Sequence, residues 1–291
     1  LYVDSQHNPA SYTEDDLQLI TAAANAVAVK LRNLSMEREL GTAARIQKSL
    51  LPRVLPEIAG FDLHARLHMC RAVGGDLYHV IPREGGKVML ALGDVSGKGM
   101  PAALAMSGCM VLLSTLAEGP ESLCEIMSRI HRQLYKLFTP EQFITLFLAE
   151  LDPVTGVLDY VNAGHEPPLV IGAGGELDHL PSGALPVAML PGFECTASST
   201  VLAPGALLAV FSDGIPEATL DGEAFLGQEP LERLLLEGRS ESLTELADGV
   251  DELLLPPIHI SELTRLGLIS YAVFCLKKKK YLCLRCIECH A

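Results

Sequence analysis

Apolar residues recur every three or four positions along the first part of the chain. Spacings of three and four alternate from residue 17 to residue 34, and the pattern resumes in a shifted frame from residue 36 to residue 50. Thr13 and Asp16 fit a capping pair at a helix start, and Pro52 follows the end of the pattern. The alternation is typical of a coiled-coil seam. It predicts a long helix whose apolar stripe either packs on its own domain or pairs with the same helix of a second chain, as in a dimerising signalling helix.

From residue 60 onward the hydrophobic period changes to two, which predicts strands. Residues 61–69 alternate apolar and polar side chains, and residues 88–95 are almost continuously apolar. Further strands are predicted at 143–151, 157–163, 193–202 and 206–212, a hairpin at 168–180, and helices at 97–117, 120–138, 229–237 and 241–255. Residues 152–156 form a tight turn between two of these strands. Strands joined by short turns, with helices grouped elsewhere, indicate an α+β domain in which helices cover antiparallel sheets.

The composition excludes two classes of partner. Of the 291 residues, 36 are Asp or Glu and 22 are Lys or Arg, which gives a formal net charge of −14. Nucleic acids are bound through basic contacts to phosphate, so no nucleic-acid partner is expected. We find no apolar run of about 18 residues, the length that a membrane-spanning helix needs, and no signal peptide. The chain is therefore expected to be cytoplasmic and to contact no membrane.

The character of the chain changes after residue 255. Residues 256–291 carry six basic and two acidic groups and four of the eight cysteines. Cys283, Cys286, Cys289 and His290 could bind zinc, although they are crowded together without a second knuckle. Chance composition in an out-of-frame tail is the favoured interpretation. The other cysteines are predicted to be small buried hydrophobic residues; they are Cys70, Cys109, Cys124 and Cys195.

Three short motifs place an aspartate beside glycine at the end of a predicted strand. They are Val73 to Tyr78 with Asp76, Gly93 to Gly99 with Asp94, and Phe211 to Gly214 with Asp213. Glycine lets backbone and carboxylate approach an ion closely, and several hard oxygen ligands suit Mg²⁺ or Mn²⁺ better than zinc. Each motif alone is also compatible with an ordinary turn. Together they predict a site with a divalent metal ion.

Two other candidate chemistries carry less weight. His165 lies in the polar patch from Asn162 to Pro168, where a lone histidine in a turn is more often structural than catalytic. No G-x-S-x-G elbow is present, which argues against a serine hydrolase, and the glycines around Lys98 do not have the spacing of a phosphate-binding loop.

With these motifs in order, residues 36–255 resemble a bacterial PPM-type (PP2C-like) protein phosphatase of the SpoIIE/RsbU group. The matching stretches are Ala44 to Pro52, Val73 to Tyr78, Gly93 to Gly99, Asn162 to Pro168 and Phe211 to Gly214. The resemblance implies an αββα sandwich with a two-metal centre of Mn²⁺ or Mg²⁺ between its sheets. It also implies that Asp94 bridges the metals, that the carbonyl of Val95 adds a ligand, and that Asp76 and Asp213 contribute carboxylates.

The same resemblance suggests a domain organisation and a partner. Residues 1–34 are similar to the end of a GAF sensor domain with its exit helix, residues 35–255 to the phosphatase domain, and residues 256–291 form the atypical tail. The activity implied is hydrolysis of phosphoserine or phosphothreonine. The substrate implied is a phosphorylated anti-sigma-factor antagonist of the STAS type in a partner-switching pathway.

Two departures from the family pattern bear on activity. His79 stands where the family has a second aspartate, three residues after the first. The family also closes with an Asp-Asp strand that supplies a metal ligand, and here no aspartate follows Asp251. We therefore expect both a core strand and a ligand to be lost, through a frameshift or a replaced C-terminus. The alternative to an active phosphatase is an impaired pseudophosphatase that only binds its partner.

Overall fold

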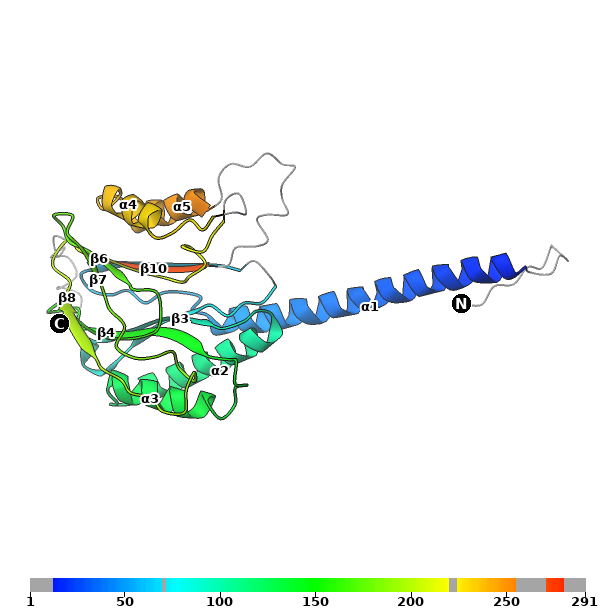
Figure 1. Ribbon diagram of the computed structural model, residues 1–291. Helices are drawn as coiled ribbons and strands as arrows, with labels where there is room; N and C mark the ends of the chain where they lie inside the picture. The colour runs from blue at the N-terminus through cyan, green and yellow to red at the C-terminus, as the bar shows by residue number, and fades with distance from the viewer. Residues whose placement is uncertain (1–12, 70–71, 220–223, 255–270, 280–291) are drawn as a thin grey trace, which may run out of the picture. The chain divides into compact units, whose positions relative to one another are not determined.

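A computed structural model describes residues 13–69, 72–219, 224–254 and 271–279 (Figure 1). The chain divides into two compact units, Leu1–Ile46 and Gln47–Ala291. In the first unit, the predicted long helix is confirmed as α1 (Glu14–Leu50), whose last turn belongs to the second unit. Thr13 and Asp16 cap its start, because the Asp16 amide donates to the Thr13 hydroxyl at 3.2 Å and the Thr13 amide donates to the Asp16 carboxylate at 2.8 Å.

The second unit contains two antiparallel sheets of five strands each. Sheet A has the order β1-β10-β9-β6-β7, and sheet B has the order β2-β3-β4-β5-β8. The strands are β1 (Phe61–His68), β2 (Leu77–Pro82), β3 (Val88–Val95), β4 (Ile144–Leu151), β5 (Val157–Ala163), β6 (Leu169–Ile171), β7 (Leu177–His179), β8 (Ser198–Val201), β9 (Leu207–Phe211) and β10 (Tyr271–Lys278). Tight turns at residues 152–156 and 172–176 join neighbouring strands, as the sequence predicts.

Helices cover the outer face of each sheet, so the predicted αββα sandwich is confirmed (Figure 1). Helices α2 (Met100–Ala117) and α3 (Leu123–Leu134) pack on sheet B, and α4 (Glu229–Glu237) and α5 (Leu243–Leu254) lie over sheet A. A short 3₁₀ turn, η1 (Glu84–Gly86), joins β2 to β3. Three hydrophobic clusters fill the layers, one under each helix pair and one between the sheets. The middle cluster is the layer that borders the candidate site.

Strand β10 overturns the expectation that a core strand is lost. Residues 271–278 pair with β1 on one side and with β9 on the other, in the interior of sheet A. Ala272, Phe274 and Leu276 face the cluster between the sheets, and alternate residues face the helix side. A strand that is buried on both faces is almost continuously apolar. This run was not predicted as a strand because it lies within a basic, cysteine-rich segment.

Some predicted boundaries differ from the observed ones. The expected strand at 193–202 is shortened to β8, and β2 was not predicted at all. Helix α3 begins after Ser122 rather than at Pro120, because the Ser122 hydroxyl accepts the Glu125 amide in a capping box. The sequence was expected to contain no apolar segment long enough to span a membrane. Among the described helices, α2 does have that length and composition, but it packs on sheet B.

Two of the scattered cysteines are not simple hydrophobic residues. Cys124 at the start of α3 and Cys195 ahead of β8 form a disulfide, with their Cα atoms 5.6 Å apart. Cys109 and Cys275 are free and buried, as expected of small apolar side chains. The prediction was wrong for the bonded pair because 71 positions separate them in the sequence, and the fold alone brings them together. Cys70 and the candidate zinc ligands of the tail lie outside the described residues.

Candidate metal centre

The three predicted aspartates lie at strand ends that border the space between the sheets. Asp76 directly precedes β2, Asp94 is the penultimate residue of β3, and Asp213 follows β9 by two residues. Leu90 and Leu92 of β3 face the cluster between the sheets, and side chains alternate along a strand. Asp94 therefore shares their face and points between the sheets. Pairing of β2 with β3 brings Asp76 and Asp94 to the same end of sheet B, and the charge of Asp213, from the other sheet, also acts on Asp94.

Gly75 forms a cradle against two of the oxygen atoms assigned as ligands by resemblance. A Cβ atom placed on Gly75 would lie 2.8 Å from the carboxylate Oδ1 of Asp94 and 2.8 Å from the carbonyl oxygen of Val95. Any side chain at this position would displace one or both oxygens. The glycine of the first motif therefore allows the backbone beside Asp76 to approach the end of β3 closely.

The carboxylates of this region act on one another electrostatically. The pKa of Asp94 is raised to about 8, mainly by burial and then by the negative charges of Asp76, Asp213 and Glu217. Burial also raises the pKa of Asp213. Every charged side chain that shifts Asp94 is acidic, so the ionised form of this carboxyl group lacks a stabilising cation. A divalent cation would remove that penalty.

The donor set fits Mg²⁺ or Mn²⁺, although it is not assembled into a ready-made site. Carboxylate and carbonyl oxygens are the ligands that these hard ions prefer. Within the described ranges, no group of three or more His, Cys, Asp or Glu side chains already holds the geometry of a metal site. Carboxylates without a cation repel one another, and a bound ion would draw them together. We conclude that the residues present fit a divalent ion, with adjustment of their side chains.

The last turn of α1 fixes the loop that carries Asp76. Gln47 is 3% exposed, and its side-chain amide donates to the carbonyl of Gly74 at 2.6 Å. The amide of Gly74 donates in turn to the Gln47 side-chain oxygen at 3.1 Å. This pair of bonds holds Gly74, which directly precedes Gly75 in the cradle. Gln47 lies in one of the stretches that match the family pattern, but the sequence alone indicates no role for it.

Two further glutamates lie beside the aspartates and were not predicted as site residues. Burial raises the pKa of Glu166, with smaller contributions from the charges of Asp213 and Glu217. The amide of Glu217 donates to the carbonyl of Asp213 at 2.8 Å, so one turn connects them. The spacing of four residues from Asp213 is the sequence signal that could have identified Glu217.

His165 has the surroundings of a structural residue, as the sequence analysis favoured. Its Nδ1 atom lies 2.9 Å from the hydroxyl of Thr145, and burial lowers its pKa to about 4. The Asn162 side chain accepts the His165 amide at 2.8 Å and donates to its carbonyl at 3.1 Å. The asparagine thereby closes the turn, and the imidazole stays neutral at physiological pH.

His79 and Asp251 lie away from the aspartates. The Nε2 atom of His79 lies 3.0 Å from the hydroxyl of Ser114 on α2, which places the side chain on the helix-covered face of sheet B. Asp251 on α5 accepts hydrogen bonds from Arg66 of β1 and from the hydroxyl of Tyr271 of β10. Both side chains are engaged on the outer faces of the sheets, so neither replaces a ligand between them.

Comparison with known sequences identifies relatives over most of the chain. A profile described as stage II sporulation protein E (SpoIIE) matches residues 84–262. The phosphoserine phosphatase RsbU of Bacillus subtilis is 26% identical over 228 residues, which are 77% of this chain and 68% of that protein. The phosphoserine phosphatase RsbP of Bacillus subtilis is 27% identical over 192 residues, which are 64% of this chain and 47% of that protein. The chain thus spans less than half the length of RsbP.

Solved structures show the same fold. The SiaA-PP2C domain of Pseudomonas aeruginosa has a TM-score of 0.70 at 17% identity, covering 84% of this chain and 98% of that one. The RsbU and RsbW domains of a Mycobacterium tuberculosis protein have a TM-score of 0.68 at 23% identity, covering 79% of this chain and 63% of that one. The phosphatase domain of SpoIIE from Bacillus subtilis, with a fragment of its regulatory domain, has a TM-score of 0.61 at 21% identity, covering 75% and 64%.

Proposed function

This chain belongs to the SpoIIE family, and on that premise we propose that it is a metal-dependent phosphatase of phosphoserine or phosphothreonine in proteins. Two relatives that match it are phosphoserine phosphatases. The observation that carries the proposal is the set of acids at Asp76, Asp94 and Asp213, in which the negative charges of Asp76 and Asp213 act on Asp94, with Gly75 packed against the oxygens of Asp94 and Val95. An arrangement of this kind is unfavourable unless it holds cations.

The roles of the residues are assigned by the family resemblance. Asp76, Asp94 and Asp213 would hold the ions through their carboxylates, and Val95 would offer its carbonyl. A bound pair of Mn²⁺ or Mg²⁺ ions supplies an acidified water and neutralises the charge of the phosphoryl group. Asp94 must lose its proton to bind, because its raised pKa leaves it substantially protonated near neutral pH in the metal-free chain.

The proposal extends to the partner and to assembly. By family likeness, the substrate is a phosphorylated STAS-type anti-sigma-factor antagonist of a partner-switching pathway in the cytoplasm, downstream of a GAF-like sensor. Assembly into a homodimer through α1 is supported by its exposed apolar side chains. Leu17, Val27 and Leu31 are 56%, 50% and 62% exposed in the single chain. Pairing two such helices would remove this stripe from water, at about 25 cal/mol for each Å² buried.

A catalytically impaired pseudophosphatase is the second candidate, and one observation favours it. Strand β10 occupies the position of a closing strand in sheet A, but its eight residues contain no carboxylate. A site with fewer acidic ligands holds two divalent ions less tightly. If this deficit limits activity, replacing residues 269–270 by Asp-Asp should raise both the affinity for Mn²⁺ and the rate of phosphate release.

The test compares metal binding and turnover in the full chain. Calorimetric titration with Mn²⁺ and phosphate release from a phosphoserine-bearing STAS protein would be measured for the native chain, for Asp94→Asn and for Asp178→Asn. Asp178 is an exposed residue of β7 and serves as the matched control. The proposal predicts Mn²⁺ binding and EDTA-sensitive turnover that Asp94→Asn abolishes and Asp178→Asn leaves intact. Metal binding without turnover, or the absence of metal binding, would refute the active phosphatase and favour the pseudophosphatase.

A further inference from the structure

Residues 181–197 form a strap that connects β7 to β8 and lies against both sheet B and helix α3. The structure describes all of these residues, and none of them belongs to a helix or a strand. Near the start of the strap, the amide of Ala184 donates to the carbonyl of Asn162 in β5 at 3.1 Å. Near its end, Cys195 is joined to Cys124 of α3 by the disulfide. The strap therefore links sheet B to one of the helices that cover it.

The middle of the strap pairs with the first residue of β4. The amide of Ile144 donates to the carbonyl of Val187 at 2.9 Å, and the amide of Val187 donates to the carbonyl of Ile144 at 2.8 Å. On its other side, Ile144 pairs with Val95, and the next residue of β4, Thr145, pairs with Asp94. The width of one strand thus separates the strap from two of the residues assigned to the metal centre. Release of the strap would remove a support from the strand end that carries them.

The strap is held against α3 with a strained backbone. Ala188 has a φ of 64°, in the left-handed region that residues other than glycine rarely adopt. Its amide donates to the Nδ1 atom of His131, a buried residue of α3, at 3.1 Å. The ring of Phe193 stacks on the same imidazole, with the ring centroids 4.7 Å apart. A strained residue persists only while its surroundings hold it, so we expect this part of the strap to relax when the disulfide opens.

The disulfide is accessible to a reductant. Both of its cysteines are only partly buried, and Cys124 lines a cavity of about 580 Å³ that opens to solvent. Cys109 and Cys275 differ, because burial raises the pKa of both thiols to about 12, which makes them unreactive. In the cytoplasm, where the proposed function places the chain, a disulfide is more often a redox sensor than a permanent crosslink.

We propose that the Cys124–Cys195 disulfide is a redox switch that acts through the strap on the affinity of the metal centre, an inference that rests on the function proposed above. The reductant is a dithiol. One of its thiolates attacks a sulfur of the disulfide, and its second thiol then displaces the mixed disulfide. Two electrons and two protons pass from the dithiol, which becomes a disulfide, to the two cysteines, which become thiols. The oxidised chain holds the strap and binds metal tightly, and the reduced chain releases the strap and binds metal weakly.

Hydrogen exchange measured by mass spectrometry in EDTA tests release of the strap in the absence of metal. The full native chain would be compared in its oxidised form and after reduction with dithiothreitol, with the reductant removed under anaerobic conditions. Calorimetric titration with Mn²⁺ then gives the metal affinity of both forms. This comparison needs no variant, so it does not depend on the folding of one.

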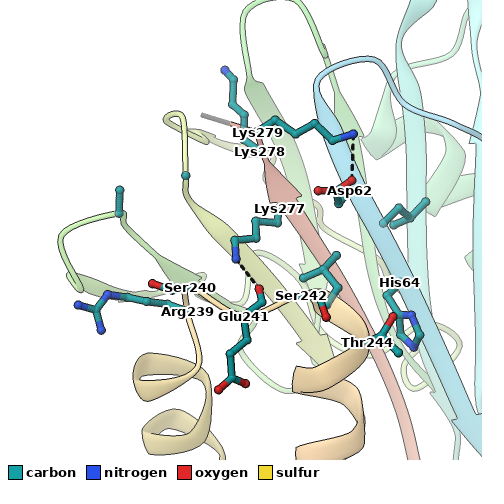
Figure 2. Close-up of a pocket in the computed structure, with 14 residues that line it drawn as sticks. Asp62, His64, Arg239, Ser240, Glu241, Ser242, Thr244, Lys277, Lys278 and Lys279 are labelled. Atoms are coloured by element: carbon teal, nitrogen blue, oxygen red, sulfur yellow. Dashed lines mark hydrogen bonds and ion pairs between the residues drawn. The ribbon is translucent and has the colours of Figure 1, made fainter. Parts of the chain in front are cut away.

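Two controls isolate the effect of this disulfide. Cys124→Ser/Cys195→Ser retains every other cysteine, so any response that it still shows to dithiothreitol comes from elsewhere. Helices α4 and α5 are the internal control, because they lie over the other sheet. The turn between them is tied to β10 independently of the strap, since the Lys277 ammonium donates to the carbonyl of Glu241 at 2.7 Å (Figure 2).

On reduction, we expect the amides of the strap to exchange about tenfold faster and those of α4 and α5 to change less than about twofold. The affinity for Mn²⁺ should fall by about fivefold or more. The double variant should match the reduced native chain under both treatments.

Three results would overturn the switch and leave the metal centre in place. They are equal exchange of the strap in the two redox forms, faster exchange with unchanged Mn²⁺ affinity, and a double variant that still responds to dithiothreitol. Absence of Mn²⁺ binding in both redox forms would refute the proposed metal centre itself, and the switch with it.

Discussion

Replacing Gln47 by alanine removes both hydrogen bonds that hold Gly74 beside the candidate metal centre. The amide and the carbonyl of Gly74 would each lose their side-chain partner. An unsatisfied buried polar group costs about 1–3 kcal/mol, and Gly74 is half-buried, so water would recover part of this cost. We therefore expect a total loss of about 2 kcal/mol, which corresponds to roughly a 30-fold change in an equilibrium constant.

This loss should fall on metal binding, because Gly74 positions Gly75 against Asp94 and Val95. Titration calorimetry with Mn²⁺ should show that Gln47→Ala lowers the affinity by at least tenfold, with a parallel loss of phosphate release at limiting metal. Gln47→Glu should be no better than alanine, because a carboxylate oxygen would then face the Gly74 carbonyl. Saturating Mn²⁺ should restore much of the activity.

Two measurements separate this positioning role from a general loss of stability. Lys48→Ala, at the exposed neighbouring position, should leave Mn²⁺ affinity unchanged. Urea unfolding of the metal-free Gln47→Ala chain measures how much of the expected loss of about 2 kcal/mol lowers the free energy of unfolding, rather than the affinity for metal. A Gln47→Ala chain that binds Mn²⁺ within twofold of the native affinity would refute the reasoning, whatever its stability.

Three further predictions concern stability. In the metal-free chain, raising the pH from about 7.5 to about 8.5 should lower the free energy of unfolding, because folded Asp94 with its pKa of about 8 retains a proton that the unfolded chain has lost. Histidines of the unfolded chain have a pKa of about 6.5 and are mostly neutral in this window, so urea titrations should show a slope that Asp94→Asn flattens; a rising stability would contradict it. The double variant Cys124→Ser/Cys195→Ser should lose about 4 kcal/mol of stability under oxidising conditions, because the disulfide spans 71 positions, and should match the native chain in dithiothreitol. Arg83→Met should cost about 3 kcal/mol in urea unfolding, since it leaves the largely buried Glu150 carboxylate without this partner, and a loss below about 1 kcal/mol would show that water enters the site.

The layers of the sandwich were predictable because most elements have a clear hydrophobic period. Helix α4 and strand β5 match their predicted ranges residue for residue. Strand β2 was not predicted because Tyr78 and His79 interrupt its apolar residues, and its strand conformation depends on pairing with β3. Strand β10 was not predicted because the basic, cysteine-rich composition around it indicated a tail outside the domain. Strand β2 is stabilised by the strand that follows it in the chain, and β10 by β1 and β9, which are distant in sequence; periodicity reveals neither pairing.

The candidate site shows the same division between local and long-range information. Aspartate next to glycine at a strand end is a local signal, and it identified Asp76, Asp94 and Asp213. The bonds of Gln47 to Gly74 join residues 27 positions apart, and only the folded chain shows them. The electrostatic contribution of Glu217 likewise depends on the approach of β9 to β3. Residue types thus indicated the candidate acids, whereas the residues that position them required the structure.

The place of β10 in sheet A has a consequence for how the domain folds. Within the described residues, β10 is the only strand of sheet A that pairs with β1. About 200 residues of the chain separate each residue of β1 from its partner in β10. Closing so long a loop is entropically costly and must precede any gain from the pairing. A growing chain on the ribosome would therefore hold β1 and β9 as unpaired edges until residue 278 had left the exit tunnel. We expect sheet A to form late and sheet B to form first, and chains cut before residue 271 to aggregate through those open edges.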